Sequence, residues 1–243
     1  MLAVKQRVLG DYAAQMAPDA IIATNTSSLS VDKLAAGLPH PERVVGMHFF
    51  NPVKRMPLVE VVRGSATSDA VVARTARLAL DLGKTPVVCK DVAGFLVNRV
   101  LGPYLDEAVR LAEAGADLEA VDRALVDFGM PMGPYELLDE VGLDVALHAA
   151  GSLAEAYGER MLPSQHLKPL VDAGHLGKKT GRGIYVWEGA PGGRPRKKGR
   201  NRARPRPAGR LDLPAEVVVD RLVHARLNEA ARALEEQVVA GPR

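Results

Sequence analysis

Hydrophobic residues follow two different patterns along the chain, and the change falls near residue 92. Before that point, short and almost continuous apolar runs alternate with stretches in which apolar residues recur every three or four positions. The runs predict strands buried on both faces, and the wider spacing predicts amphipathic helices. The expected strands are 20–25, 43–50, 57–62 and 85–90, and the expected helices are 4–16, from Ser28 or Ser30 to Leu38, and 69–82. This alternation indicates a parallel, wound α/β sheet.

From Gly94 onward the pattern is helical. Residues 94–115 predict one long amphipathic helix, and the segments 117–128, 135–160 and 164–174 also have helical spacing. The next strand-like run is Gly-Ile-Tyr-Val-Trp at 183–187. We therefore expect an α/β domain over residues 1–92 and an all-helical domain over 93–190, so the fold class is α/β plus all-α.

Part of the long helix recurs near the C-terminus. Val97–Gly115 aligns without gaps with Val219–Gln237, each residue lying 122 positions further on, and seven of the nineteen positions are identical. Two unrelated helices rich in Arg, Glu and Ala would also share some residues. The common pattern R-x5-L-x-E-A-x-R-x2-E favours a duplication, so residues 213–243 are interpreted as the start of a second helical repeat.

Charge is distributed unevenly along the chain. There are 32 Lys and Arg against 29 Asp and Glu, but nine of the basic residues lie between Arg194 and Arg210, where there is no acid. Outside this run 23 basic residues (32 minus 9) stand against 29 acidic ones. A basic run can bind nucleic acid or an anionic membrane. This one is rich in Gly and Pro and has no aromatic residue, so residues 191–212 are interpreted as a disordered linker and no nucleic acid is expected as a partner.

Composition restricts the kinds of site that the chain can hold. No apolar run approaches the roughly 18–20 residues of a membrane span, and the first residues lack the apolar core of a signal peptide. Cys89 is the only cysteine, so no internal disulfide can form, and a reducing compartment such as the cytoplasm is expected. The six histidines are scattered, which is unlike a metal site.

His48 and Glu60 are the first candidates for chemistry, because each lies inside an apolar, strand-like run: GMHFFNPV (46–53) and PLVEVV (57–62). One interpretation is plain: His48 is half-buried and Glu60 faces water at a strand edge. In the other, Glu60 is buried and needs a hydrogen-bond donor. An imidazole on the neighbouring strand would be that donor, and its other nitrogen would exchange a proton with a substrate.

Two further polar groups occur in unusual settings. Asn98 lies on the apolar stripe of the 94–115 helix, where its amide must find hydrogen bonds. Thr26, Ser27 and Ser28 follow a strand and precede a helix, at the sheet edge where α/β proteins bind ligands. For Asn98 the alternative is an ordinary contact between helices. For the three hydroxyl residues the alternative is simple N-capping. Together with the histidine and glutamate, these groups indicate proton transfer to or from a small polar group, in a cleft between the two domains.

Six motifs in this order resemble the L-3-hydroxyacyl-CoA dehydrogenases: ATNTSSL, GMHFFNPV, PLVEVV, KDVAGFLVNRVLGPYLDEA, PMGPYELLDEVGLD and GKKTGRGIYVW. The resemblance covers about residues 4–188. The basic run and the repeated helix are similar to the dehydrogenase segment of the bacterial multifunctional fatty-acid β-oxidation α subunit. The resemblance implies the C-terminal half of a Rossmann-like parallel sheet, followed by the all-helical C-terminal domain of that family.

The resemblance also implies the chemistry, which is NAD-dependent oxidation of a 3-hydroxyacyl-CoA to a 3-ketoacyl-CoA. By motif, His48 is the catalytic base and Glu60 is its partner. Ser27 contacts substrate and nicotinamide, and Asn98 holds the substrate oxygen. The implied cofactor-binding residues are Lys5, Ser27, Asn51 and Lys179. A thiolase subunit is the macromolecular partner that the resemblance implies.

One expected feature is absent from the sequence. The cofactor domain of the family opens with a strand, a G-x-G-x-x-G turn and a helix, followed by an acidic residue about twenty positions later. The turn does not occur in these 243 residues, so we expect a fragment that binds NAD weakly and forms homo-oligomers through an exposed sheet edge. The alternatives are a stand-alone 3-hydroxybutyryl-CoA dehydrogenase, against which residues 191–243 argue, and a non-catalytic remnant that assembles with other chains.

Overall fold

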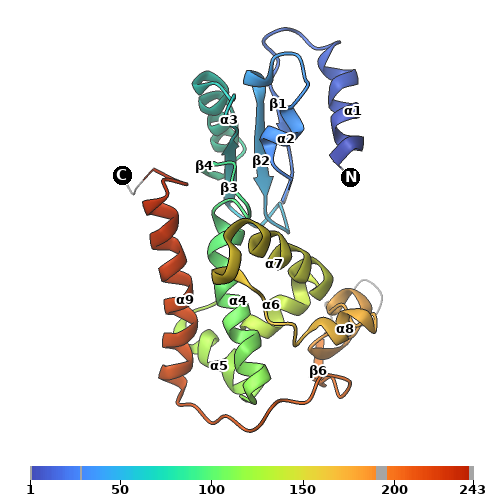
Figure 1. Cartoon of the computed structure of the whole chain (residues 1–243), viewed down its shortest axis with the longest axis vertical. Coiled ribbons are helices and arrows are strands. Elements are labelled where there is room, and N and C mark those ends of the chain that lie inside the picture. The colour runs from blue at the N-terminus through green and yellow to red at the C-terminus, as the bar shows by residue number, and fades with distance from the viewer. Residues whose placement is uncertain (1, 28, 190–195, 241–243) are drawn as a thin grey trace. The chain divides into compact units, whose positions relative to one another are not determined.

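The computed structural model describes residues 2–27, 29–189 and 196–240. The chain divides into two compact units, and Figure 1 labels most of their helices and strands. The first unit consists of residues 1–98 and 231–243, and the second consists of residues 99–230. Among the described residues, no helix is both long enough and apolar enough to cross a membrane.

The first unit is built on a four-stranded sheet of order β1-β2-β3-β4. Its elements are α1 (Leu2–Ala13), β1 (Ile22–Thr24), α2 (Val31–Ala35), the 3-10 helix η1 (Pro41–Arg43), β2 (Val44–Phe49), β3 (Leu58–Arg63), α3 (Asp69–Asp81) and β4 (Thr85–Lys90). Each strand and helix expected in residues 1–92 is present. The N-cap of α2 is Ser30, whose side chain accepts a hydrogen bond from the Lys33 N–H. Ser28, the alternative cap, lies outside the described residues.

Strand directions differ from the expectation at one place. β1 and β2 are parallel, and so are β3 and β4, but β2 and β3 are antiparallel. The prediction of a wholly parallel sheet is therefore wrong for this central pair. The connection between the two strands covers only residues 50–57 and contains no helix. Parallel neighbours need a crossover of a dozen or more residues, so a connection this short joins an antiparallel pair.

Side chains alternate between the two faces of the sheet. Val45 of β2 packs in a cluster with residues of α3, whereas Val44 packs in a separate cluster with residues of α1 and α2. Successive side chains of a strand point to opposite faces. His48 therefore lies on the same face as Val44, away from α3. Glu60 is the direct partner of His48 on β3, so it lies on that face as well.

The second unit is mainly helical (Figure 1). Its elements are α4 (Val97–Ala114), α5 (Leu118–Phe128), α6 (Pro134–Val141), α7 (Leu143–Tyr157), η2 (Gly158–Met161), α8 (Lys168–Asp172), η3 (Lys178–Thr180), β5 (Tyr185–Glu188), β6 (Arg196–Arg200) and α9 (Ala215–Glu235). The first residues of α4 and the last residues of α9 belong to the first unit. The helical segment expected over 135–160 is divided at Gly142, whose φ of 100° ends one helix before the next begins.

A buried aspartate that the sequence did not reveal organises part of this unit. Asp139 is 1% exposed and accepts hydrogen bonds from the backbone N–H groups of Ile184 and Tyr185 and from the Trp187 indole. Gly183 lies so close that a Cβ there would come within 2.0 Å of Asp139 Oδ1. Gly183 of the GKKTGRGIYVW motif is thus required by its close packing against this carboxylate.

The basic segment is part of the second unit. The expectation of a disordered linker is wrong for Arg196–Arg200, which form β6 and pair with β5 in antiparallel fashion. Lys197 forms an ion pair with Glu136, and Arg200 forms one with Asp117. The acidic remainder of the chain thus supplies partners for this charge. Residues 190–195, at the start of the expected linker, lie outside the described residues.

Candidate active site

The register between β2 and β3 places His48 directly opposite Glu60. The imidazole Nδ1 lies 2.7 Å from Glu60 Oε2, which is a short hydrogen bond. Glu60 is fully buried and His48 is 6% exposed. A glutamate that faces water at a strand edge is therefore excluded. The pair is one in which a buried carboxylate has found its donor.

The second oxygen of the Glu60 carboxylate is held by the start of α4. Oε1 accepts hydrogen bonds from the backbone N–H groups of Leu96 at 2.9 Å and Val97 at 2.8 Å. The N-terminal end of a helix also favours negative charge. A carboxylate with both oxygens engaged in this way acts as an acceptor, so Nδ1 of His48 carries the hydrogen. The other ring nitrogen, Nε2, is then left as an acceptor.

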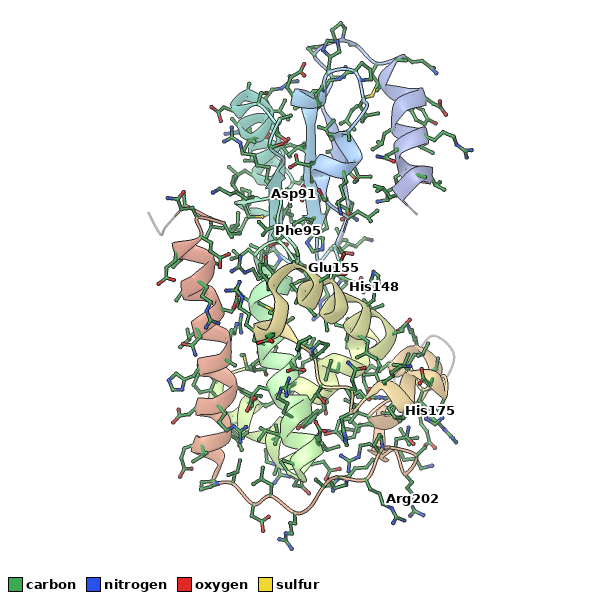
Figure 2. All side chains as sticks on the ribbon, in the orientation of Figure 1. Asp91, Phe95, His148, Glu155, His175 and Arg202 are labelled. Atoms are coloured by element: carbon green, nitrogen blue, oxygen red, sulfur yellow. The ribbon has the colours of Figure 1, made fainter. Side chains whose placement is uncertain are left out.

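The turn that aims these two N–H groups has a left-handed backbone. Gly94 has a φ of 73° and Phe95 a φ of 49°. Glycine adopts this conformation freely, whereas a residue with a Cβ does so at a cost. The Phe95 ring is buried, and its centroid lies 5.7 Å from that of His48. Figure 2 labels Phe95 in the connection that leads from β4 to α4.

Asn98 and Ser27 lie together in the same unit. The Asn98 amide nitrogen is 3.5 Å from the Ser27 carbonyl oxygen. Asn98 is the next residue after Val97, whose backbone N–H group holds Glu60. The four predicted catalytic residues are thus linked in the order His48, Glu60, Asn98 and Ser27. The hydroxyl of Thr26, in contrast, is used within its own loop, where it bonds the backbone of Leu29. The expected cleft between the two domains stays a prediction.

The other predicted cofactor residues have different surroundings. Asn51 is exposed in the β2–β3 connection, three residues after His48. Lys5 is partly buried on α1. Lys179 lies in the second unit, where its Nζ is 2.5 Å and 2.8 Å from the two carboxylate oxygens of Asp144. A role for these three residues in binding NAD stays a prediction.

Sequence reasoning missed the backbone groups at the start of α4 as ligands of Glu60. A glycine just before the long amphipathic helix was the available signal, since it marks a backbone turn.

Cys89 lies in the same unit, but its thiol does not have the lowered pKa of a reactive cysteine. Burial raises the pKa of its thiol, and the charge of Glu60 acts in the same direction. Among the described residues, no group of three or more His, Cys, Asp or Glu could hold a metal ion.

Two family models together match most of the chain. Residues 1–92 match the NAD binding domain of 3-hydroxyacyl-CoA dehydrogenase, and residues 94–187 match the C-terminal domain of the same enzymes. The chain belongs to the 3-hydroxyacyl-CoA dehydrogenase family. Its α/β domain is therefore the NAD-binding domain of this family. The expected order, an α/β domain followed by a helical domain, is confirmed.

Solved structures of this family have the same fold. The chain is 45% identical to 3-hydroxybutyryl-CoA dehydrogenase from Escherichia coli K12, with a TM-score of 0.74 over 78% of this chain and 41% of that one. The (S)-3-hydroxybutyryl-CoA dehydrogenase PaaH1 from Ralstonia eutropha is 39% identical, with a TM-score of 0.74 over 77% and 67%. The dehydrogenase part of multifunctional enzyme 1 from C. elegans is 25% identical, with a TM-score of 0.65 over 99% and 55%. The chain thus spans less than half the length of the E. coli protein.

Proposed function

We propose that the first unit carries the acid–base site of an NAD-dependent dehydrogenase that oxidises a 3-hydroxyacyl-CoA to a 3-ketoacyl-CoA. The buried His48–Glu60 pair supports this most strongly, because it leaves one imidazole nitrogen ready to accept a proton. A bound NAD would supply the acceptor for the hydride that leaves C3 of the substrate. His48 Nε2 takes the proton of the C3 hydroxyl as the hydroxyl becomes a carbonyl.

Glu60 acts through His48 and not on the substrate. Its carboxylate accepts the Nδ1 hydrogen, which fixes the tautomer and the orientation of the ring. When Nε2 takes up a proton, the negative charge of Glu60 stabilises the imidazolium. Two backbone N–H groups hold the carboxylate in place, and burial keeps water from screening the charge.

Ser27 and Asn98 are the groups that we assign to the substrate oxygen. The 3.5 Å distance between the Asn98 amide nitrogen and the Ser27 carbonyl oxygen is at the long limit of a hydrogen bond. The amide is therefore only weakly engaged, and it can donate to a ligand instead. The exposed Ser27 supplies a hydroxyl beside it. In the reverse direction, both donors would stabilise negative charge as it develops on the C3 oxygen.

The side chains of this chain fit one end of NAD. Ser27 and Asn51 follow the ends of β1 and β2, two parallel strands whose carboxyl ends meet at one edge of the sheet. Ligands of α/β proteins bind at such an edge. Their hydroxyl and amide groups suit the nicotinamide and its ribose. The phosphates require a glycine-rich turn at a helix N-terminus, which the 243 residues do not contain.

The proposed reaction belongs to fatty-acid β-oxidation. The resemblance of the basic run and the repeated helix to the dehydrogenase segment of the bacterial multifunctional fatty-acid β-oxidation α subunit supports this assignment. The 3-ketoacyl-CoA product is cleaved by a thiolase in such a sequence of reactions. A thiolase subunit is therefore the proposed partner, the cytoplasm is the proposed location, and an acyl-CoA is the proposed substrate.

The test is an acetoacetyl-CoA reduction assay with NADH. The enzyme assayed is this chain joined behind a strand, G-x-G-x-x-G turn and helix of the kind that opens the cofactor domain of the family. General acid–base catalysis contributes roughly 10²–10⁴-fold, so His48→Gln is expected to lower turnover by about that factor, and Glu60→Gln by a similar or smaller one. His224→Gln, an exposed position on α9, is the matched control and should leave turnover unchanged. Unchanged turnover in His48→Gln would refute the assignment.

A further inference from the structure

Asp91 joins two segments of the first unit that carry groups of the proposed site. It follows β4 directly, in the connection that leads to α4, where Figure 2 labels it together with Phe95. Its carboxylate oxygen Oδ2 accepts a hydrogen bond from the Ser30 hydroxyl at 2.7 Å and another from the backbone N–H group of Asp32 at 2.8 Å. Asp91 therefore links the segment before α4 to the start of α2.

The segment that carries Asp91 is anchored on β3 at both of its ends. The backbone N–H group of Asp91 donates to the Arg63 carbonyl oxygen at 3.0 Å, which extends the contact between β4 and β3 by one residue. At the other end, two N–H groups at the start of α4 hold Glu60 of β3. Asn98 lies in the first turn of that helix. The Asp91 carboxylate and the Asn98 amide thus extend from one anchored segment.

The loop between β1 and α2 transmits the position of Asp91 to Ser27. The Thr26 hydroxyl accepts a hydrogen bond from the Leu29 N–H group at 2.9 Å and donates one to the Leu29 carbonyl oxygen at 3.1 Å. These two bonds close a short loop that contains Ser27. Ser30 follows directly, and its hydroxyl is the group that Asp91 holds. A displacement of Ser30 would therefore displace Ser27 as well.

The other end of this loop is tied to β2. Asn25 Oδ1 accepts a hydrogen bond from the Phe49 N–H group at 3.3 Å, and Phe49 directly follows His48. Ser27 thus lies between a contact to the strand of the proposed base and a contact to the segment of Asn98. The contact through Asp91 is the stronger one, because an ionised carboxylate accepts both of its hydrogen bonds at short distances.

The direct contact between Ser27 and Asn98 is too weak to fix their spacing. The Asn98 amide nitrogen lies 3.5 Å from the Ser27 carbonyl oxygen, at the long limit of a hydrogen bond. In the proposed reaction the same amide donates to the substrate, so it does not hold the loop at that moment. The spacing of the two groups then depends on contacts outside the pair, and the Asp91 carboxylate provides the strongest of these.

We propose that Asp91 is a positioning residue of the acid–base site. Its carboxylate sets the spacing between the Ser27 hydroxyl and the Asn98 amide, so that both donate to the C3 oxygen of the substrate. Asp91 itself does not touch the substrate. Donors stabilise developing charge most strongly when they are already in place before the reaction begins. This inference rests on the proposed function, which assigns Ser27 and Asn98 to the substrate oxygen.

A matched carboxylate separates positioning from general stability. Asp32 Oδ1 also accepts two hydrogen bonds, from the backbone N–H group and the hydroxyl of Ser65. Asp32→Ala removes these bonds but keeps the Asp32 N–H group that donates to Asp91. Asp91→Ala removes the same number of bonds and releases the loop of Ser27. Asp91→Asn is the conservative variant, because both bonds end on one oxygen and the amide retains an acceptor there.

The kinetic readout is acetoacetyl-CoA reduction by NADH, with this chain joined behind the glycine-rich segment. A misplacement of about 1 Å can cost roughly 100-fold in rate, so Asp91→Ala is expected to lower kcat by about 10–100-fold and to leave the KM for NADH unchanged. Asp91→Asn should recover most of the loss, and Asp32→Ala should leave kcat unchanged. Asp91→Ala should cost less in an Asn98→Ala background, because its effect acts through that amide.

The side-chain amide resonances of Asn98 provide a readout in the 243-residue chain, without cofactor or substrate. Their loss in Asn98→Ala assigns them. They should shift in Asp91→Ala and stay in place in Asp32→Ala. A low-field N–H resonance from His48, expected for its short hydrogen bond to Glu60, shows that the acid–base pair is still formed. Should Asp91→Ala lose that resonance, Ser30→Ala removes the same 2.7 Å bond from its other side and takes its place in the comparison.

The outcomes distinguish this inference from the proposed function. Equal losses of kcat in Asp91→Ala and Asp32→Ala overturn the inference, as do additive effects of Asp91→Ala and Asn98→Ala. Unmoved Asn98 resonances in Asp91→Ala overturn it as well. Unchanged turnover in Asn98→Ala would contradict the assignment of this residue to the substrate oxygen, and with it the inference. A large loss in Asn98→Ala beside full turnover in Asp91→Ala would overturn the inference alone.

Discussion

Glu60 and Asp122 are both buried carboxylates, but their surroundings differ. Glu60 accepts a hydrogen bond from an imidazole whose other nitrogen can exchange a proton. Asp122 lies in the core of the helical unit, where it accepts hydrogen bonds from the Tyr185 hydroxyl at 2.7 Å and the Tyr135 N–H at 2.9 Å. Burial raises the pKa of Asp122 to about 6, although both hydrogen bonds act against this shift. Asp122 is therefore a residue whose protonation affects folding.

The Asp122 carboxyl should make the free energy of unfolding depend on pH. Its pKa in the folded chain, about 6, lies above the ordinary value of 3.8, so the folded state binds a proton that the unfolded state has lost. This stabilisation is complete below pH 3.8 and is lost as the pH rises through 6. The full loss is about 3 kcal/mol. Asp122→Asn should remove most of it, because the amide stays neutral at every pH.

Urea unfolding of both proteins on either side of pH 6 measures this difference. The stability of Asp122→Asn, relative to the unmodified chain, is expected to improve as the pH rises. Asp172→Asn is the control, because Asp172 lies at an exposed ion pair with Lys168. An identical pH dependence in Asp122→Asn and the unmodified chain would show that Asp122 is already ionised in the folded state.

At the residue scale, the sequence revealed the polar groups that interrupt apolar strands and the amide of Asn98 on a helix, but it missed the buried carboxylate of Asp122. His48 and Glu60 stand out because a strand with apolar neighbours on both sides has no obvious place for a charge. Asp122 gave no such signal, since an aspartate on an amphipathic helix ordinarily faces water. Its partner Tyr185 is 63 residues further along the chain. Only the packing of distant segments determines that this aspartate is buried.

At the scale of elements, the left-handed turn before α4 connects the fold to the site. Gly94 lies in that turn, and Gly83 has nearly the same φ, 71° against 73°, at the C-terminal end of α3. Changing either to alanine should cost about 1–2 kcal/mol of stability, because a Cβ disfavours this backbone conformation. Only Gly94→Ala should also disturb the hydrogen bonds from Leu96 and Val97 to Glu60.

Proton NMR can follow that disturbance without an activity assay. The imidazole N–H of His48 donates to a buried carboxylate, so a low-field resonance is expected. It should disappear in Glu60→Gln, weaken or shift in Gly94→Ala, and stay unchanged in Gly83→Ala. An unchanged resonance in Gly94→Ala would mean that the turn does not position the Glu60 carboxylate.

The elements themselves were predicted to different degrees. Strands and helices with a clear period were found, including all four strands of the sheet. The direction of β3 relative to β2 was not, although the short connection of residues 50–57 already favoured an antiparallel pair. β6 was missed because its five residues are almost all charged, and charge without periodicity is typical of a linker. Its pairing with β5 depends on acidic partners such as Glu136, which lie far away in the sequence.

At the scale of the whole molecule, apolar surface remains exposed on the first unit. Val4, Val8 and Tyr12 recur every four residues along α1, and they are 57%, 42% and 64% exposed. β1 lies at one edge of the four-stranded sheet in the part of the chain that the structure describes. Neighbouring apolar side chains and an unpaired strand edge both favour further pairing. The expected homo-oligomer is consistent with these features and stays a prediction.

NAD binding by the 243-residue chain is expected to be very weak. The phosphates of NAD are held best by backbone N–H groups at a glycine-rich turn and by the positive end of the following helix. No such turn occurs in the sequence. Lys5 and Lys179 supply only point charges, and Lys179 already pairs with Asp144. The hydroxyl and amide groups of Ser27 and Asn51 fit the nicotinamide end, but they cannot replace the contacts to the phosphates.

Calorimetry with NAD tests this expectation, on the chain alone and on the chain joined behind a strand, G-x-G-x-x-G turn and helix of the kind that opens the family's cofactor domain. The joined protein should gain micromolar affinity, and changing the glycines of that segment to alanine should abolish the gain, because a Cβ would block close approach of the pyrophosphate. The low-field imidazole resonance of His48 should be present in all three proteins, since every contact of Glu60 lies within residues 48–97. A formed acid–base pair beside an absent phosphate site would then explain low turnover of the chain alone. Micromolar NAD affinity in the unextended chain would contradict this argument, because the phosphates would have to be bound by residues other than a glycine-rich turn.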